Sequence, residues 1–330
     1  MIEIDYLGGP EVAALNLTDA EILEAVDQGL IAAGRGETVI EPRMHLRPGV
    51  AEGHFNVLRG YIAPLDLAGV KVVGDFYRNY EQGLPSEMGL VNLFCPRTGT
   101  PKAIVDAAGI TDMRTGAVTA LGAKRLAPEA PRVLGHIGAR GSSYWNVRLL
   151  DHLFDFEEIR VHSRRPESRQ GFAERLSRDL GKKVVATETW ETCLKGADIL
   201  VEASRLDKPT PLFDPDWVRP GALVVPYGTM STLPLDFTDR FDMFVMDDIG
   251  QMQAGPFGAL RPQINAGKIT EESFAAEIGE IAAGLKPGRT SADQTILFWH
   301  RGLATSDIAL AAFMLEKAKS LGIGQRLAYA

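Results

Sequence analysis

The chain has 330 residues, enough for about two domains. Its composition, 45% hydrophobic and 24% charged, is typical of a folded globular protein, and the net charge of −8 argues against general binding to nucleic acid. We expect no membrane span or signal peptide, because no long apolar run occurs and the first residues lack a basic region. Cys95 and Cys193 stand far apart, so a cytoplasmic protein is expected.

The first third of the chain predicts a mostly antiparallel sheet. A short strand over residues 2–6 precedes a helix capped by Thr18 or Asp19. Alternating apolar residues then predict strands at 39–45, 54–62, 69–74, 89–94 and 103–106.

Lys71 interrupts the apolar run of the strand at residues 69–74. A lysine that faces inward is costly to bury unless it meets an anion. The alternative is that Lys71 lies on a solvated face of the strand, and alternation alone does not separate the two readings.

The rest of the chain predicts a parallel sheet. A helix over 111–126, opened by Thr111 as its cap and carrying Arg114, precedes alternating strands and helices between residues 132 and 246. Such alternation predicts a parallel, doubly wound sheet. Two further helices are predicted at 271–283 and 304–321, and the last one is expected to return to the first domain.

A glycine turn follows the first strand of this domain. Gly138-Ala-Arg140-Gly141-Ser142 ends a buried strand and opens a helix, the place where a dinucleotide pyrophosphate binds. The spacing is shorter than the full glycine fingerprint, so a plain tight turn is the alternative.

The second strand of the domain ends in Ser163-Arg164-Arg165. NAD enzymes carry an acidic residue there to bind the ribose diol, and this chain has two arginines in its place. Because arginine pairs with a 2′-phosphate, NADP is favoured over NAD as the cofactor; solvated loop charges are the alternative.

These residues resemble the ornithine cyclodeaminase/mu-crystallin family over almost the whole chain. The resemblance rests on Ile110-Thr-Asp-Met-Arg114-Thr115-Gly-Ala117 above all, and on Pro42-Arg43, Gly69-Val-Lys71, Gly83-Leu-Pro-Ser86 and Gly302-Leu-Ala-Thr-Ser-Asp307. It implies a homodimer whose substrate and dimerisation domain is formed by residues 1–113 with 304–330. A Rossmann domain at 114–303 is inserted into it, which makes the fold α/β.

The resemblance also implies roles for single residues. Arg43, Lys71 and Arg114 match residues around the substrate carboxylate, and three converging cations would orient such a group. The positions that match or adjoin cofactor contacts are Ser86, Arg114, Thr115, Gly138, Arg140, Gly141, Ser142, Ser163, Arg164, Arg165, Ser204, Gly228, Thr229 and His300.

The chain departs from the cyclodeaminases at several of these places. Their acid–base aspartate lies in a loop that here reads Val225-Pro-Tyr-Gly-Thr-Met, with no carboxylate. A glutamate near the distal amine is replaced by Asn56, and a serine near the nicotinamide by His300. Arg59 and Arg78 are expected near the substrate and suggest a dicarboxylic imino acid such as iminosuccinate, unless they are ordinary surface charges.

The sequence therefore predicts an NAD(P)H-dependent reductase of an imino acid, or equivalently an amino-acid dehydrogenase. Lys71 and His300 are the two candidates for moving the proton, since both side chains can titrate near neutrality in a suitable environment. The remaining histidines show no ligand spacing, so no metal is expected. The alternatives are an ammonia-releasing cyclodeaminase and a non-catalytic NADP-binding protein of the mu-crystallin type.

Overall fold

The computed structural model describes residues 1–330, the side chain of Tyr80 excepted, and the chain divides into two compact units. Unit 1 comprises Met1–Arg114, Gln253–Gly255 and Gly302–Ala330, and unit 2 comprises Thr115–Met252 and Pro256–Arg301. The predicted boundaries at 113 and 304 thus differ from this division by one and two residues, and the short segment 253–255 is an addition. Among the described helices, none is long and apolar enough to cross a bilayer.

Unit 1 is built on a mixed sheet with the strand order β15-β1-β6-β5-β4-β3-β2. Its β1 and β6 run parallel and the other neighbours are antiparallel. The elements are β1 (Glu3–Leu7), α1 (Gly9–Ala14), α2 (Asp19–Gly34), β2 (Thr38–Leu46), β3 (His54–Ile62), β4 (Leu67–Asp75), β5 (Glu87–Phe94), β6 (Pro101–Asp106), α9 (Ala304–Leu321) and β15 (Gln325–Ala328).

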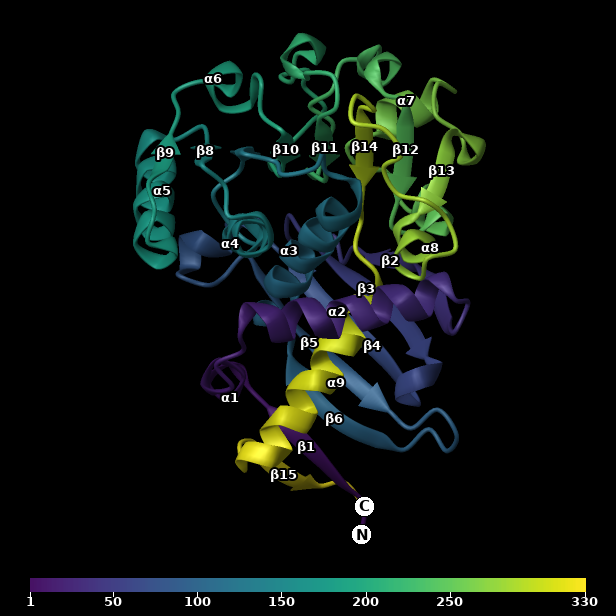
Figure 1. The fold of residues 1–330 in the computed structure, drawn as a ribbon. Helices are drawn as coiled ribbons and strands as arrows, with labels where there is room; N and C mark the ends of the chain where they lie inside the picture. The colour runs from purple at the N-terminus through teal and green to yellow at the C-terminus, as the bar shows by residue number, and fades with distance from the viewer. The chain divides into compact units, whose positions relative to one another are not determined.

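One face of this sheet is covered by helix α9, which packs on β3 and β4, and α2 packs on α9 (Figure 1). Helix α2 begins at the Thr18 cap, whose side chain accepts a hydrogen bond from the backbone of Glu21. The last helix therefore does return to the first unit, as predicted. The segment after it adds β15, which pairs with β1 and so brings the two chain ends together.

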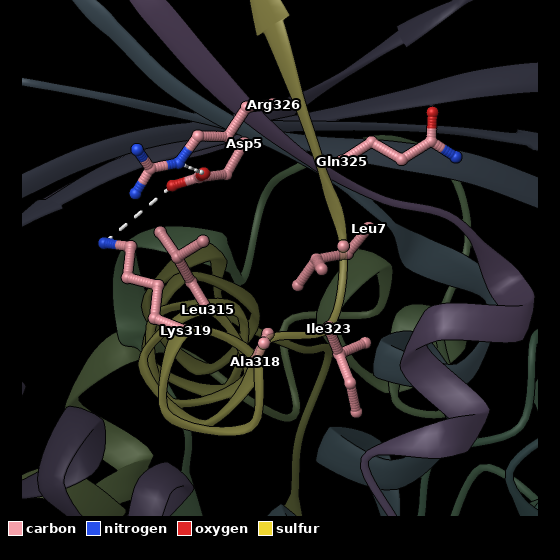
Figure 2. Close-up of a pocket in the computed structure, with 10 residues that line it drawn as sticks. Asp5, Leu7, Leu315, Ala318, Lys319, Ile323, Gln325 and Arg326 are labelled. Carbon is pink, nitrogen blue, oxygen red and sulfur yellow. Dashed lines mark ion pairs between the residues drawn. The ribbon is translucent and has the colours of Figure 1, made fainter.

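A small surface pocket of unit 1 lies between the end of α9, β1 and β15 (Figure 2). Across it, the Asp5 carboxylate faces Lys319 at 3.9 Å and Arg326 at 3.7 Å. These side chains are partly exposed, and the pocket shares no lining residue with the buried cations described below.

Unit 2 contains a parallel sheet with the order β13-β12-β14-β11-β10-β7-β8-β9, the predicted doubly wound arrangement. Its elements, with α3 crossing the boundary at its start, are α3 (Ala107–Leu126), β7 (Val133–Ile137), α4 (Ser143–Phe154), β8 (Glu158–His162), α5 (Pro166–Leu180), β9 (Val184–Ala186), α6 (Trp190–Leu194), β10 (Ile199–Glu202), β11 (Leu223–Pro226), β12 (Met243–Met246), α7 (Arg261–Asn265), β13 (Phe274–Glu277), α8 (Ile278–Ala282) and β14 (Ile296–Trp299).

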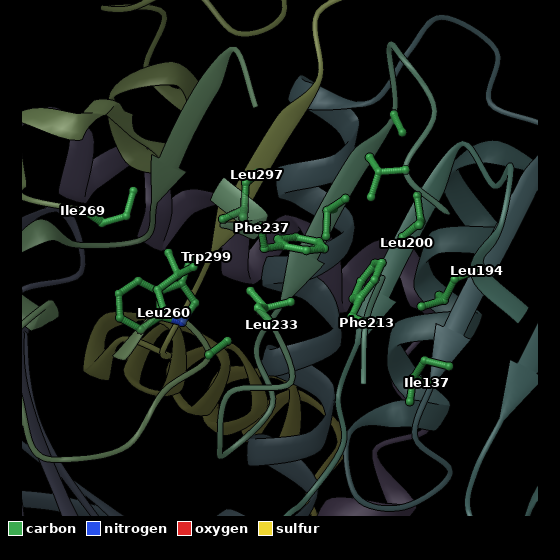
Figure 3. Packing of buried hydrophobic residues seen from close by; sticks show 14 of the residues in the cluster. Ile137, Leu194, Leu200, Phe213, Leu233, Phe237, Leu260, Ile269, Leu297 and Trp299 are labelled. Atoms are coloured by element: carbon green, nitrogen blue, oxygen red, sulfur yellow. The ribbon is translucent and has the colours of Figure 1, made fainter. Parts of the chain in front are cut away.

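The strands of unit 2 are apolar because both faces of the sheet are covered. Leu200, Leu297 and Trp299 from the sheet pack with Phe213 and Phe237 in a cluster of buried hydrophobic residues (Figure 3). Because β7, β10, β11 and β14 are parallel neighbours, their carboxyl ends meet at one edge of the sheet. The loops at this edge carry predicted cofactor residues.

Two sequence-based boundaries are wrong. Helix α3 begins at Ala107, not at a Thr111 cap; the Thr111 hydroxyl instead bonds back to the Ala107 carbonyl inside the helix. The predicted helix at 271–283 is a strand, Phe274–Glu277, followed by the short helix Ile278–Ala282, because pairing with β12 outweighs local helix propensity.

Candidate active site

Lys71 lies on the covered face of the unit 1 sheet. It belongs to a row of residues paired across β3, β4, β5 and β6, in which Leu58, Val91 and Val105 are apolar. The Lys71 side chain is 1% exposed, which rules out the reading of a solvated lysine. Its Nζ donates hydrogen bonds to Asp307 Oδ1 at 2.7 Å and to Thr111 Oγ1 at 3.3 Å.

A second cation binds the same carboxylate oxygen. Arg114 in α3 is 7% exposed, and its Nε lies 2.9 Å from Asp307 Oδ1. The Arg114 guanidinium packs so closely on Gly302, which has φ +87°, that a side chain at Gly302 would overlap it. Arg43 donates from Nη2 to the Gly302 carbonyl at 3.0 Å, so Arg43, Lys71, Arg114 and Asp307 form what we call the cation cluster.

The cation cluster has one carboxylate for two buried cations that bind it. Lys71 and Arg114 share Asp307 Oδ1, and Asp307 Oδ2 accepts no hydrogen bond from the described residues. Burial lowers the pKa of Lys71 to about 8; the positive charge of Arg114 and, less strongly, of Arg43 acts in the same direction, while Asp307 opposes it. A second anion placed here would relieve this repulsion, so the cluster has the chemistry of a carboxylate-binding site.

Asp307 is the residue of this cluster to which sequence reasoning gave no role. A signal was present, since Asp307 is the one charged residue between Ala304 and Leu315 in an otherwise apolar helix. A carboxylate at such a position is buried with the apolar face and needs a cation there.

The predicted substrate residues on β3 fall on opposite faces of the sheet. Asn56 shares the face of Lys71, and in the described part of the chain its buried Oδ1 has no partner. Arg59 pairs with Val70 on the other face and forms an exposed ion pair with Glu41 at 3.2 Å. Strand alternation therefore keeps Arg59 out of the cation cluster.

Arg78, also expected near the substrate, forms surface ion pairs. Its guanidinium lies 3.1 Å from Glu52 and is 62% exposed. Ser86, a predicted cofactor contact in the same unit, is partly exposed, and its carbonyl accepts the backbone N–H of Phe76.

The glycine turn of unit 2 joins β7 to α4, as predicted. Gly138 and Gly141 have φ of +117° and +55°, so the chain turns sharply at both. Arg140 and Gly141 are exposed, and Ser142 is the N-cap of the twelve-residue helix α4. A helix N-terminus with exposed backbone beside an arginine suits the negative charge of a pyrophosphate.

The end of β8 carries the predicted arginine pair. Arg164 and Arg165 are exposed, and Arg165 is the N-cap of α5, directly after Ser163. Two cations at a helix N-terminus, with the Ser163 hydroxyl beside them, have the charge and donors that a 2′-phosphate requires.

Glu202 at the end of β10 is a buried acid that sequence reasoning missed. Its Oε1 accepts the backbone N–H of Ser204 at 2.8 Å, and Gly228 packs against the carboxyl group. Its carbonyl accepts the N–H groups of Tyr227 and Gly228, so Glu202 fixes both predicted cofactor loops. Burial raises the pKa of Glu202 to about 7, and the acid is therefore neutral below that pH.

His300 follows β14 and is 2% exposed. Its Nε2 lies 2.9 Å from the hydroxyl of Thr119 in α3, and its ring stacks on Tyr227 with a centroid distance of 4.7 Å. Thr115, one turn before Thr119, is 8% exposed, and Thr229 follows the Tyr227-Gly228 turn. Tyr227 and Thr119 were not predicted, because nothing local in the sequence shows that they meet His300.

Among the described residues, no group of three His, Cys, Asp or Glu side chains could hold a metal ion.

Comparison with known proteins decides the family. Residues 7–322 match the sequence pattern of the ornithine cyclodeaminase/mu-crystallin family. The chain belongs to this family. An alanine dehydrogenase of Archaeoglobus fulgidus is 29% identical over 324 residues, covering 97% of this chain and 96% of the relative.

Solved structures agree with the fold. A Δ1-pyrroline-2-carboxylate reductase of Thermococcus litoralis, in complex with NADH and L-proline, has a TM-score of 0.91 at 26% identity and covers 98% of this chain and 99% of its own. An archaeal alanine dehydrogenase dimer with bound NAD has a TM-score of 0.88 at 27% identity, covering 100% of both chains. The iminosuccinate reductase of Paracoccus denitrificans in complex with NAD⁺ has a TM-score of 0.89 at 26% identity, and the match covers 99% of this chain and 100% of the reductase chain.

The contact of Asp307 with two buried cations predicts a large effect of Asp307→Asn on stability. Removing the charge leaves Lys71 and Arg114 buried without their anion, which should lower the free energy of unfolding by about 3–5 kcal/mol. Urea unfolding followed by circular dichroism measures this loss. The control Glu21→Gln, which breaks a less buried ion pair with Lys317, should cost about 1 kcal/mol or less; equal losses would contradict the argument.

Proposed function

We propose that this protein is an NAD(P)H-dependent reductase of an imino acid, or the equivalent amino-acid dehydrogenase. The observation that carries the proposal is the cation cluster, in which the single carboxylate of Asp307 is shared by the buried cations Lys71 and Arg114, with Arg43 on the Gly302 carbonyl beside them. A substrate carboxylate supplies the missing anion and is oriented by the three donors.

In this proposal the cofactor binds at the glycine turn and the arginine pair of unit 2. Gly138, Gly141 and Ser142 would hold the pyrophosphate, and Arg164 and Arg165 a 2′-phosphate, which favours NADP. The solved relatives contain NADH or NAD, so the test includes both cofactors. When bound, the nicotinamide supplies or accepts the hydride.

The protein's own residues hold the acid and move the proton. Lys71 and His300 remain the two candidates for moving the proton, and each is buried with a hydrogen-bond partner. In the reductive direction the group donates a proton to the imine nitrogen, and the carbon next to the carboxylate is reduced.

The two arginines that suggested a dicarboxylic substrate lie at the surface. Arg59 and Arg78 are paired with Glu41 and Glu52, so they give no support to a dicarboxylic substrate. The similarity to an iminosuccinate reductase keeps iminosuccinate among the candidates, beside cyclic imines.

A panel of substrates tests the function. Cofactor absorbance is followed with cyclic imines, iminosuccinate, keto acids with amines, and diamino acids, with NADH and NADPH in turn. We expect oxidation of the reduced cofactor with at least one imino acid. Release of ammonia from ornithine without net cofactor turnover would instead select a cyclodeaminase, and tight NADP binding without any turnover a mu-crystallin-type binding protein.

The pKa of Lys71 predicts how the affinity for the acid depends on pH. Lys71 has a pKa of about 8 when no substrate is bound, and a bound carboxylate raises this pKa. Binding of the acid therefore takes up a proton above about pH 8. The affinity for the acid that the panel identifies should therefore be constant near pH 7 and fall as the pH rises through about 8 to 9. Calorimetric titration in two buffers of different ionisation enthalpy measures both the affinity and the proton uptake.

The variant Lys71→Arg keeps its charge over this range and is the matched control, which should bind with little dependence on pH. Affinity of the wild-type protein that stays constant from about pH 7 to 9, with no proton uptake, would contradict a role for Lys71 in binding the carboxylate.

We also propose that the protein is a homodimer through the uncovered face of the unit 1 sheet. Met44, Val57, Val72 and Leu90 form one row across β2, β3, β4 and β5 on this face. Met44 is 58% and Leu90 43% exposed, which is unusual for a sheet face unless another surface covers it. The archaeal alanine dehydrogenase is a dimer, which supports a dimer here, while the choice of face rests on the exposed apolar row.

Charges on this row should separate the subunits. The double variant Met44→Arg/Leu90→Arg is expected to sediment as a monomer of 35.8 kDa, while the wild type sediments at twice that mass. Leu285→Arg, which changes an exposed leucine of unit 2, is the control and should remain dimeric. A double variant that stays dimeric would place the interface elsewhere.

A further inference from the structure

His136 is a polar residue inside the apolar strand β7. It is 0% exposed, and its partners in the sheet are Val161 of β8 and Val201 of β10. The ring of Phe172 in α5 lies 6.3 Å from the imidazole. Burying an imidazole among such groups costs its hydration, so the contact that the ring makes in return needs a reason.

The contact determines which nitrogen of the His136 ring carries hydrogen. Nδ1 lies 3.2 Å from the carbonyl oxygen of Gly138, and a carbonyl can only accept, so Nδ1 is the donor. Nε2 has no hydrogen-bond partner in the described part of the chain. Burial lowers the pKa of His136 to about 4, so at pH 7 the ring is neutral with its hydrogen on Nδ1.

The bond from His136 completes a set of restraints on Gly138. The N–H of Gly138 donates to the carbonyl of His162 at the end of β8, at 2.9 Å. A Cβ atom on Gly138 would lie 2.9 Å from the carbonyl of Ala203 and 3.1 Å from the Ser143 hydroxyl, so its α-carbon packs closely at the end of β10. With the carbonyl held as well, the peptide between residues 138 and 139 has one orientation.

This orientation exposes a backbone donor. In a trans peptide the C=O and N–H bonds point in opposite directions. Because the Gly138 oxygen faces the buried ring, the N–H of Ala139 points away from it, and among the described residues it meets no acceptor. Ala139 is half-buried and Arg140 exposed, directly before α4. A backbone N–H beside an arginine at a helix start suits a phosphate oxygen.

We propose that His136 is a positioning residue of the cofactor turn, whose bond to the Gly138 carbonyl holds the Ala139 N–H ready for a pyrophosphate oxygen of the dinucleotide. The inference rests on the proposed function and assigns a further residue to its cofactor site. Without this bond the peptide is free to rotate, and a rotated peptide presents its carbonyl oxygen to the anion, which repels it.

Nitrogen NMR of the full-length protein tests the tautomer without any cofactor. In protein labelled with ¹⁵N-histidine at pH 7, the His136 signals are assigned by their loss in His136→Asn. We expect the pattern of a neutral ring with hydrogen on Nδ1. A ring with hydrogen on Nε2, or a charged ring, would overturn the inference and leave the reductase function untouched.

Two variants test whether the bond matters for the cofactor. His136→Asn keeps a donor at nearly the same place, because the amide nitrogen and Nδ1 are both bonded to Cγ, whereas His136→Leu removes the donor. NADPH and NADH are titrated in turn, and binding is followed by fluorescence. His136→Leu should bind the cofactor that the wild type prefers about 3- to 10-fold more weakly, and His136→Asn within about twofold of the wild type. Equal affinity of His136→Leu and the wild type would overturn the role of His136.

Thermal unfolding separates positioning from general stability. His136→Leu also removes the unpartnered Nε2, so it should unfold at about the wild-type temperature although it binds the cofactor more weakly. Leu134→Ala is the control, since Leu134 is a buried residue on the same face of β7, two residues earlier. It should unfold at a lower temperature and keep its cofactor affinity within about twofold.

The remaining outcomes distinguish this inference from the proposed function. Weaker cofactor binding in Leu134→Ala as well would mean that the turn responds to any loosening of β7, and would overturn a specific role for His136. Cofactor binding without turnover of any imino acid would contradict the reductase function alone. A wild-type protein that binds neither cofactor would overturn both.

Discussion

Two buried cations share one carboxylate oxygen in unit 1, and this contact explains most of what surrounds it. Lys71 and Arg114 both bind Asp307 Oδ1, although Lys71 and Asp307 are 236 residues apart in the chain. Each cation is costly to bury alone, so the carboxylate between them stabilises the folded state. Because it does not neutralise them fully, the same contact leaves an excess of positive charge that suits an acid substrate.

The arrangement of unit 2 follows from a different constraint, the alignment of parallel strand ends. Once β7, β10, β11 and β14 lie side by side, the residues just beyond them share one edge of the sheet. Ser142, Glu202, Tyr227 and His300 lie at or beyond these ends. Hydrogen bonds join Ser142 and Glu202 to Tyr227, and ring stacking joins Tyr227 to His300. The positions of these side chains are determined by the register of the parallel strands, and the glycine turn is the one irregular backbone feature that the arrangement uses.

The comparisons and the geometry support each other at different levels. Family membership and TM-scores of about 0.9 establish the fold and make a nicotinamide enzyme the natural reading. They do not select a substrate. The positions at which this chain departs from the cyclodeaminases bear on that choice. The exposed ion pairs of Arg59 and Arg78 remove the sequence-based argument for a second carboxylate, and the loop without the aspartate places Tyr227 against the ring of His300.

The sequence by itself determined most of the order of elements and the position of the glycine turn, because periodicity and glycine spacing are local signals. Alternation left the burial of Lys71 open, and the roles of Arg43 and Arg114 came from the family resemblance. The sequence placed the start of α3 and the segment at 271–283 wrongly, where back-bonding of Thr111 and pairing with β12 outweigh local preference. Only the tertiary structure decided which partners meet. Alternation put Arg59 on the face away from Lys71, and packing of α9 and α3 brought Asp307 to Lys71 and Thr119 to His300. Such contacts join residues far apart in the chain, and no local pattern encodes them.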